Sequence, residues 1–283
     1  FKGLFTQGMV CHETYKDPEN NWLSPDEIIS INGKKFLQKD QTKEVVVGPS
    51  ESMSKSKKNT IDPEKMISSY GADSVRLFIL SDSPPEKDVQ WSENGMSSSF
   101  KFIQKFWLMN EKISLILKKK GDFEINKEID IFTNQAINKI NIALEKFRYN
   151  VIIAVFHEIY GFYNKFAENN NNCSNLKENY KKILIVMMPV VPHMANECLE
   201  KINSKKELNW PDVKKEFIEN DITNIVIQVN GKKRSIISVE KNLDEQNILE
   251  KIKKDRLIDK YIENKEILRT IYVQDKIINI IIR

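Results

Sequence analysis

The stretch GPSESMSKSKKNTIDP, residues 48–63, separates two kinds of sequence within the chain. It holds four serines and three lysines within nine residues, and Met53 is the only large apolar side chain among those nine. This composition predicts an exposed and flexible loop. Asp62 and Pro63 at its end predict the start of a helix, because Asp caps helix N-termini and Pro is favoured in the first helical turn.

The sequence on either side of this loop predicts strands before it and helices after it. Residues 1–47 mix short apolar runs with turn signals such as Asn32-Gly33, a pair typical of two-residue hairpin loops. After the loop, we expect Gly71 to end a first helix and Asp73 to cap a second one. The loop therefore joins strand-rich sequence to helical sequence.

The remaining sequence predicts a helical bundle and a small terminal domain. Apolar residues recur at helical spacing in four stripes from residue 97 to 205, and they alternate at period two around Asn230-Gly231. A short capped helix and two strand-like runs complete a ββαββ unit. The predicted regions are 1–70 with the loop at 48–62, a connection at 71–99, a helical bundle at 100–215, and an α/β domain at 222–283. The expected fold class is mainly α with small α/β parts.

Composition and cysteine spacing narrow the class of protein. The chain has 283 residues, 40% apolar and 30% charged, which is ordinary for a globular protein of more than one domain. No apolar run approaches the roughly 18 residues that span a bilayer, and no signal peptide is evident, so we expect a cytoplasmic protein without membrane contact. Cys11, Cys173 and Cys198 are far apart, so neither a disulfide framework nor a protein-bound metal is predicted.

The positive charge of the chain is concentrated at its C-terminal end. Residues 222–283 hold 13 Lys plus Arg against 9 Asp plus Glu, whereas the first 221 residues balance at 31 against 31. A basic terminal domain suggests contact with a polyanion such as nucleic acid, although compositional bias is an alternative. The candidate contacts are Lys232, Lys233, Arg234, Lys253, Lys254 and Arg269, with Lys101, Lys105 and Arg148 as weaker ones.

The lysines of the loop suggest an anion ligand. Lys55, Lys57 and Lys58 lie among small hydroxyl residues, and flexible ammonium groups suit oxyanions that move during a reaction. A polyphosphate is the natural ligand for such lysines. The alternative is that the segment is a solvated surface loop that binds no ligand. Ser52 and Lys55 also satisfy the S-x-x-K pattern of acyl-serine enzymes. That interpretation is disfavoured because this serine lies in a polar loop and no K-T-G follows.

Several segments, taken in order, resemble the class I aminoacyl-tRNA synthetases. Residues 52–96, SMSKSKKNTIDPEKMISSYGADSVRLFILSDSPPEKDVQWSENGM, resemble the K-M-S-K-S signature and the region after it. MMPVVPHMANE at 187–197 is similar to a helix junction of the anticodon-binding bundle. The segments GLFTQGMVCHETY, NWLSP, VIQVNGKKRSIISV and RTIYVQDKIINIII resemble bacterial-type leucyl-tRNA synthetases. The resemblance covers essentially the whole chain.

This resemblance implies a C-terminal portion of such an enzyme. It implies the remnant of a Rossmann-type catalytic domain with a KMSKS-like loop at 48–62, a stem-contact-like connection, an anticodon-binding-like bundle and a tRNA-binding terminal domain. Residues 28–47 occupy the place of a larger leucine-specific module in some members. Nothing resembles the H-I-G-H element, the leucine pocket or the editing domain, and the chain starts at Phe1, so we expect an isolated fragment to be inactive.

The implied function is part of leucine–tRNA ligase, which activates leucine with ATP and transfers it to tRNA(Leu). Lys55 is the implied catalytic residue, and Ser52 stands where the signature has its first lysine. The implied ATP-binding residues are Met53, Ser54, Lys55, Ser56 and Lys57. The implied ligands are ATP with Mg²⁺ as its counterion, leucine and tRNA(Leu), with no protein partner evident. Alternatives are a non-enzymatic tRNA-binding fragment or paralogue, and a valine- or isoleucine-type enzyme.

Overall fold

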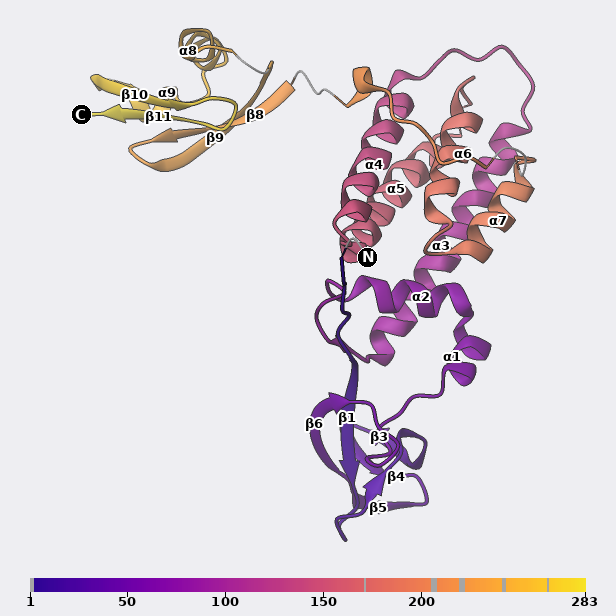
Figure 1. Ribbon diagram of the computed structural model, residues 1–283. Helices are drawn as coiled ribbons and strands as arrows, with labels where there is room; N and C mark the ends of the chain where they lie inside the picture. The colour runs from indigo at the N-terminus through magenta and orange to yellow at the C-terminus, as the bar shows by residue number, and fades with distance from the viewer. Residues whose placement is uncertain (1–2, 171, 205–207, 219–221, 241–242, 264) are drawn as a thin grey trace. The chain divides into compact units, whose positions relative to one another are not determined.

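The chain folds as two compact units, which meet in sequence between Lys214 and Lys215. The computed structural model describes residues 3–170, 172–204, 208–218, 222–240, 243–263 and 265–283. The first unit contains two small sheets and a helical bundle, and the second contains one sheet with two helices (Figure 1). Each unit has a hydrophobic core of its own.

Two sheets form the N-terminal part of the first unit. In one, β1 (Val10–Lys16) pairs antiparallel with β2 (Trp22–Leu23) and β6 (Val46–Ser52), and parallel with β7 (Val89–Gln90). After a short 3₁₀ turn at Pro25–Glu27, the strands β3 (Ile28–Ile31), β4 (Lys34–Leu37) and β5 (Asp40–Glu44) form the other sheet. The predicted hairpin turn is confirmed, since Asn32 and Gly33 both have positive φ, at 51° and 82°.

The loop after β6 leads into two consecutive helices, α1 (Pro63–Tyr70) and α2 (Ala72–Ser81). The predicted start of α1 is confirmed, because the Asp62 carboxylate accepts a hydrogen bond from the Glu64 backbone N–H at 3.0 Å. Gly71 ends this helix with a φ of 80°, a conformation that favours glycine. The expectation that Asp73 caps α2 is wrong: Gly71 is the N-cap of α2, and Asp73 lies inside its first turn.

Five further helices form the bundle of the first unit. They are α3 (Glu93–Leu117), α4 (Lys127–Glu145), α5 (Tyr149–Glu168), α6 (Leu176–Met187) and α7 (Pro192–Lys201). Their apolar faces bury Phe106, Ile137, Phe156 and Tyr180 completely, which explains the helical spacing of the apolar residues. Helix α2 and the first turns of α3 lie within 71–99, where the sequence predicts a connection.

Two side chains of α2 attach this helix to the junction between α6 and α7. The Asp73 carboxylate accepts hydrogen bonds from the backbone N–H groups of His193 (3.3 Å) and Met194 (2.6 Å), and it pairs with the His193 ring at 2.8 Å. Arg76 donates to the carbonyl oxygens of Pro189 and Val190 at 2.7 and 2.9 Å. A carboxylate thus meets the start of α7, and a guanidinium meets the turn after α6.

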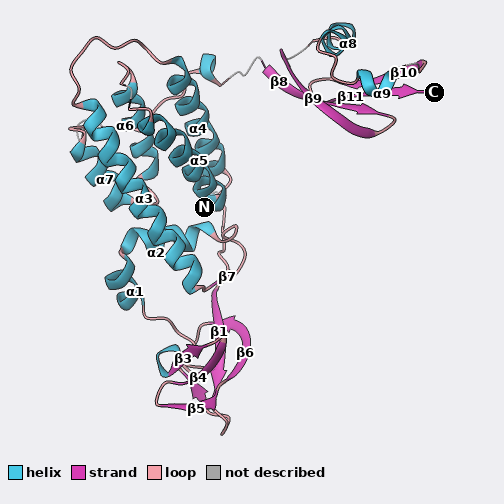
Figure 2. Cartoon of the chain, turned by 180° about the vertical axis from the view of Figure 1, so that it is seen from behind, coloured by secondary structure: helices cyan, strands magenta, loops and turns pink. Residues whose placement is uncertain are grey.

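The second unit is a four-stranded sheet with helices on one face (Figure 2). Its elements are β8 (Ile222–Val229), β9 (Lys232–Glu240), α8 (Glu245–Lys254), α9 (Asp259–Ile262), β10 (Ile267–Val273) and β11 (Ile277–Ile282). The strand order is β10-β11-β8-β9, and β11 runs parallel to β8. Ile227 and Ile278 are fully buried with Ile248 of α8, and the Asn230-Gly231 turn again has positive φ at both residues.

Candidate functional site

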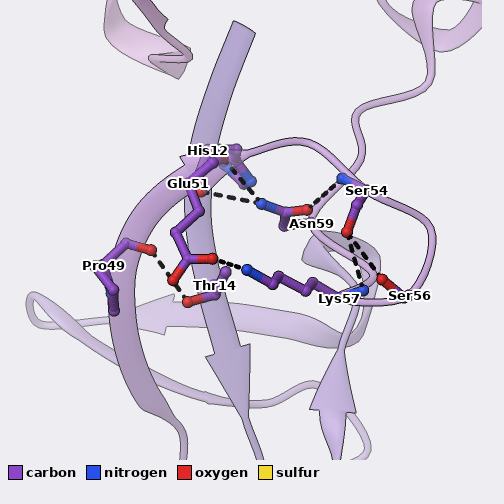
Figure 3. A network of polar contacts seen from close by, with 8 residues as sticks. All are labelled: His12, Thr14, Pro49, Glu51, Ser54, Ser56, Lys57 and Asn59. Atoms are coloured by element: carbon purple, nitrogen blue, oxygen red, sulfur yellow. Dashed lines mark hydrogen bonds and ion pairs between the residues drawn. The ribbon is translucent and has the colours of Figure 1, made fainter. Parts of the chain in front are cut away.

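Asn59 organises the serine–lysine loop from a fully buried position (Figure 3). Its side-chain N–H groups donate to the carbonyl oxygens of His12 and Glu51, both at 3.2 Å, and its Oδ1 accepts from the Ser54 backbone N–H at 2.8 Å. These bonds tie the two ends of the loop to β1 and β6. Sequence analysis missed this residue because Asn in a polar segment is usually an exposed turn residue.

The neighbouring hydroxyl groups give the loop further internal order. Met53 continues the strand pairing, since its backbone N–H donates to the Val10 carbonyl at 3.2 Å. The Ser54 hydroxyl accepts from the Lys57 backbone N–H at 3.3 Å and lies 3.1 Å from the Ser56 hydroxyl. The loop is therefore a folded turn between β6 and α1, and the predicted ATP-binding residues lie together within it.

The three lysines of the loop have different electrostatic surroundings. The Lys57 ammonium pairs with the Glu51 carboxylate. Lys58 has a φ of 54°, and its charge helps to lower the pKa of Glu27, which the backbone N–H of Ser24 lowers most. Lys55 is exposed and has no ion-pair partner among the residues that the structure describes. Lys58 is exposed too and has no ion pair among the described residues, so Lys57 is the one lysine of the three that an acidic side chain holds.

A polar cavity of about 450 Å³ lies beside the loop, where β1, β6, the insert at 28–47 and the start of α3 meet. The Lys35 ammonium of the insert donates to the Tyr15 hydroxyl at 2.7 Å and to the Glu13 carboxylate, and this bond from Lys35 lowers the pKa of Glu13. His12 lines the cavity, and its buried Nδ1 has no hydrogen-bond partner among the described residues; burial lowers the pKa of this side chain. The insert therefore contributes charge to the neighbourhood of the loop.

The candidate nucleic-acid contacts of the second unit lie on different faces. Arg234 stacks its guanidinium over the Tyr261 ring of α9 at 4.3 Å, and Lys232 is paired with Val229, whose side chain is buried on the same helix-covered face. Lys233 is opposite Gln228 on the open face. The other candidates in this unit are Lys253 and Lys254 at the end of α8 and Arg269 on β10, and all three are exposed.

The weaker candidates of the bundle are exposed as well. Lys101 and Lys105 lie on the outer side of α3, and Arg148 precedes the first turn of α5. Within the described residues, no group of three or more His, Cys, Asp and Glu side chains could hold a metal ion. None of the described helices combines the length and the apolarity needed to cross a membrane.

Comparison with known proteins places this geometry in a family. Residues 45–92, which include the loop, match the class I tRNA synthetases of the isoleucine, leucine, methionine and valine type, and residues 126–249 match the anticodon-binding domain of tRNA ligase. Over its whole length the chain is 37% identical to leucine–tRNA ligase of Rickettsia massiliae, 36% to that of Bartonella quintana, and 38% to that of Rickettsia felis. The chain belongs to the leucine–tRNA ligase family. The resemblance predicted from the sequence is confirmed.

The match covers all of this chain but only part of each relative in the leucine–tRNA ligase family. The chain spans about one third of their length, 34% in each of these three cases. Among solved structures, the LeuRS of the Agrobacterium radiobacter K84 agnB2 LeuRS–tRNA–LeuAMS ternary complex has a TM-score of 0.67 and 20% identity. The similarity covers 82% of this chain and 31% of that one, and it shows a shared fold.

Proposed function

We propose that this chain supplies the ATP-phosphate loop and tRNA-binding parts of a leucine–tRNA ligase. The whole enzyme would activate leucine with ATP and transfer it to tRNA(Leu). The observation that carries the proposal is the arrangement of the loop: Asn59 anchors it, Lys57 is held by Glu51, and Lys55 is exposed without an acidic partner among the described residues.

The chemistry of the first step suits this arrangement. When the leucine carboxylate attacks the α-phosphorus of ATP, pyrophosphate leaves and negative charge grows on its oxygens. The Lys55 ammonium would follow that charge, and a donor directed at developing charge is typically worth about 10² to 10³ in rate. Mg²⁺ would arrive with ATP as the counterion of the substrate. The fixed ends of the loop keep Lys55 close to one position while its flexible stem adjusts.

The second step requires contact with tRNA, which we assign to the helical bundle and to the second unit. The exposed cations of these regions would bind the phosphate backbone, which contributes most of the affinity of such interfaces and makes it dependent on salt. Structured RNA is recognised largely by its shape and backbone. The family match at 126–249 and the ternary complex formed by the structural neighbour support this assignment.

A chimeric enzyme tests the role of Lys55. This chain would replace the matching third of the Rickettsia massiliae ligase, and leucine-dependent pyrophosphate exchange would be measured. Lys55→Ala should slow the exchange roughly 100-fold with little change in the KM for leucine. The matched control is Lys139→Ala, which removes an exposed lysine that pairs with Glu158 in the bundle. An exchange rate unchanged by Lys55→Ala would refute the assignment.

A further inference from the structure

Glu51 is fixed more firmly than an ordinary surface carboxylate. Its backbone is paired with His12 in the β1–β6 ladder, and its carbonyl oxygen accepts a hydrogen bond from the buried Asn59. Its side chain pairs with Lys57, whose own backbone N–H donates to the Ser54 hydroxyl. Figure 3 shows the Glu51 carboxylate directed at the Lys57 ammonium, so one strand residue determines where a loop lysine points.

The Glu51–Lys57 pair has the properties of an exchangeable contact. The two side chains keep 36% and 39% of their surface exposed, and pairs at such exposure are weak because water screens them. A polyphosphate bound at Lys55 carries more negative charge than a single carboxylate and offers several oxygens to an ammonium group. Lys57 lies two residues from Lys55 in the same folded turn, so it can leave Glu51 for such an anion.

We propose that Glu51 is a positioning residue that holds Lys57 away from the phosphate site until a polyphosphate binds, and takes it back when the product leaves. This inference rests on the proposed function of the loop. On binding, Lys57 exchanges a carboxylate for a phosphate oxygen, and one contact replaces another. Because Glu51 competes with the phosphate for Lys57, the bound anion gains less than the full contact with this lysine. Glu51 therefore weakens the binding of polyphosphate and favours its release.

Variants of the 283-residue chain test the proposal with inorganic tripolyphosphate as the probe. The dissociation constant would be measured at low ionic strength from the amide NMR signals of Ser54, Lys55 and Lys57. Glu51→Gln should tighten binding about two- to fivefold, as expected for removal of a partly exposed ion pair, whereas Glu51→Asp keeps the carboxylate and should stay closer to the parent. Glu158→Gln removes the same charge from an exposed pair in the bundle and should change nothing.

The double variant Glu51→Gln, Lys57→Ala distinguishes transfer of Lys57 from Glu51 to the phosphate from simple repulsion of the anion by the Glu51 charge. If Glu51 acts through Lys57, Glu51→Gln should give little or no tightening in a Lys57→Ala background. Equal tightening in both backgrounds would overturn the proposal, because Glu51 would then act only as a nearby negative charge. Retained loop signals in the free variants would show that the fold is intact.

The parent chain provides a test that needs no variant. The carboxyl carbon signal of Glu51 should move toward that of a free carboxylate as tripolyphosphate binds, and an unmoved signal alongside shifted loop amides would overturn the proposal. Lys55→Ala separates this inference from the proposed function. If Lys55→Ala weakens binding while Glu51→Gln has no effect, only the role of Glu51 fails. Absence of loop binding in both the parent and Glu51→Gln would overturn both.

Discussion

Replacing Asn59 by alanine removes all the hydrogen bonds that fix the loop through this side chain. Three bonds are lost, to His12 O, Glu51 O and Ser54 N–H, and each is worth about 1 kcal/mol net. Their sum, about 3 kcal/mol, corresponds to roughly 100-fold in a local opening equilibrium, because 1.36 kcal/mol is tenfold. Water that enters the loop would recover part of this loss, so we expect between about 10-fold and 100-fold.

Hydrogen–deuterium exchange at the Ser54 amide measures this effect directly, since that N–H donates to Asn59. Asn59→Ala should accelerate its exchange by the stated factor and leave the bundle amides protected, because the change is local. Asn164→Ala is the control, as it removes a single side-chain bond to Glu168 on α5. A Ser54 amide that exchanges at the parental rate in Asn59→Ala would refute the anchoring role.

Three further perturbations address the other parts of the chain. Lys232→Ala with Arg234→Ala should weaken the binding of a fluorescent tRNA(Leu) transcript by about 1 to 3 kcal/mol and reduce the salt slope by about two phosphate equivalents; an unchanged slope would move the RNA contact elsewhere. Burial lowers the pKa of His12 below 6.5, so the unfolded state binds more protons and the first unit should lose stability as the pH falls below 6.5. In urea unfolding at pH 7 and pH 5.5, His12→Asn should show a smaller loss than the parent, and an equal loss would contradict this. Phe156→Ala should destabilise the first unit by about 3 to 5 kcal/mol and leave the urea transition of the second unit unchanged; a shift of both transitions would contradict the division into two units.

Local structure was predictable wherever the deciding interactions are close in sequence. Asp62 caps the helix that it begins, and the Asn-Gly pairs at 32–33 and 230–231 form turns because both residue types tolerate positive φ. The period of the apolar residues predicted the bundle because each helix buries one face. In each case the physical cause lies within a few residues of the pattern.

The details of the site depend on contacts that spacing does not encode. Asn59 is buried in the middle of a polar segment because β1 supplies the carbonyl of His12, which lies 47 residues earlier. Lys57 and Lys55 have the same side chain, and only the fold brings Glu51 to one of them. The spacing predicts Asp73 as the cap of α2, whereas Asp73 lies inside α2 and its carboxylate bonds to the start of α7. Sequence patterns could therefore identify the loop, but not which residue anchors it or which of its lysines forms an ion pair.

The attachment of α2 to the α6–α7 junction has a practical consequence for dissecting the protein. Helix α7 has no side-chain cap from its own N-cap residue, Val191, and the carboxylate that meets its first N–H groups belongs to Asp73, 120 residues earlier. A bundle expressed from α3 onward would leave those N–H groups, and the carbonyl groups that Arg76 meets, without these partners. A truncated bundle should therefore begin no later than Gly71, so that Asp73 and Arg76 keep these contacts.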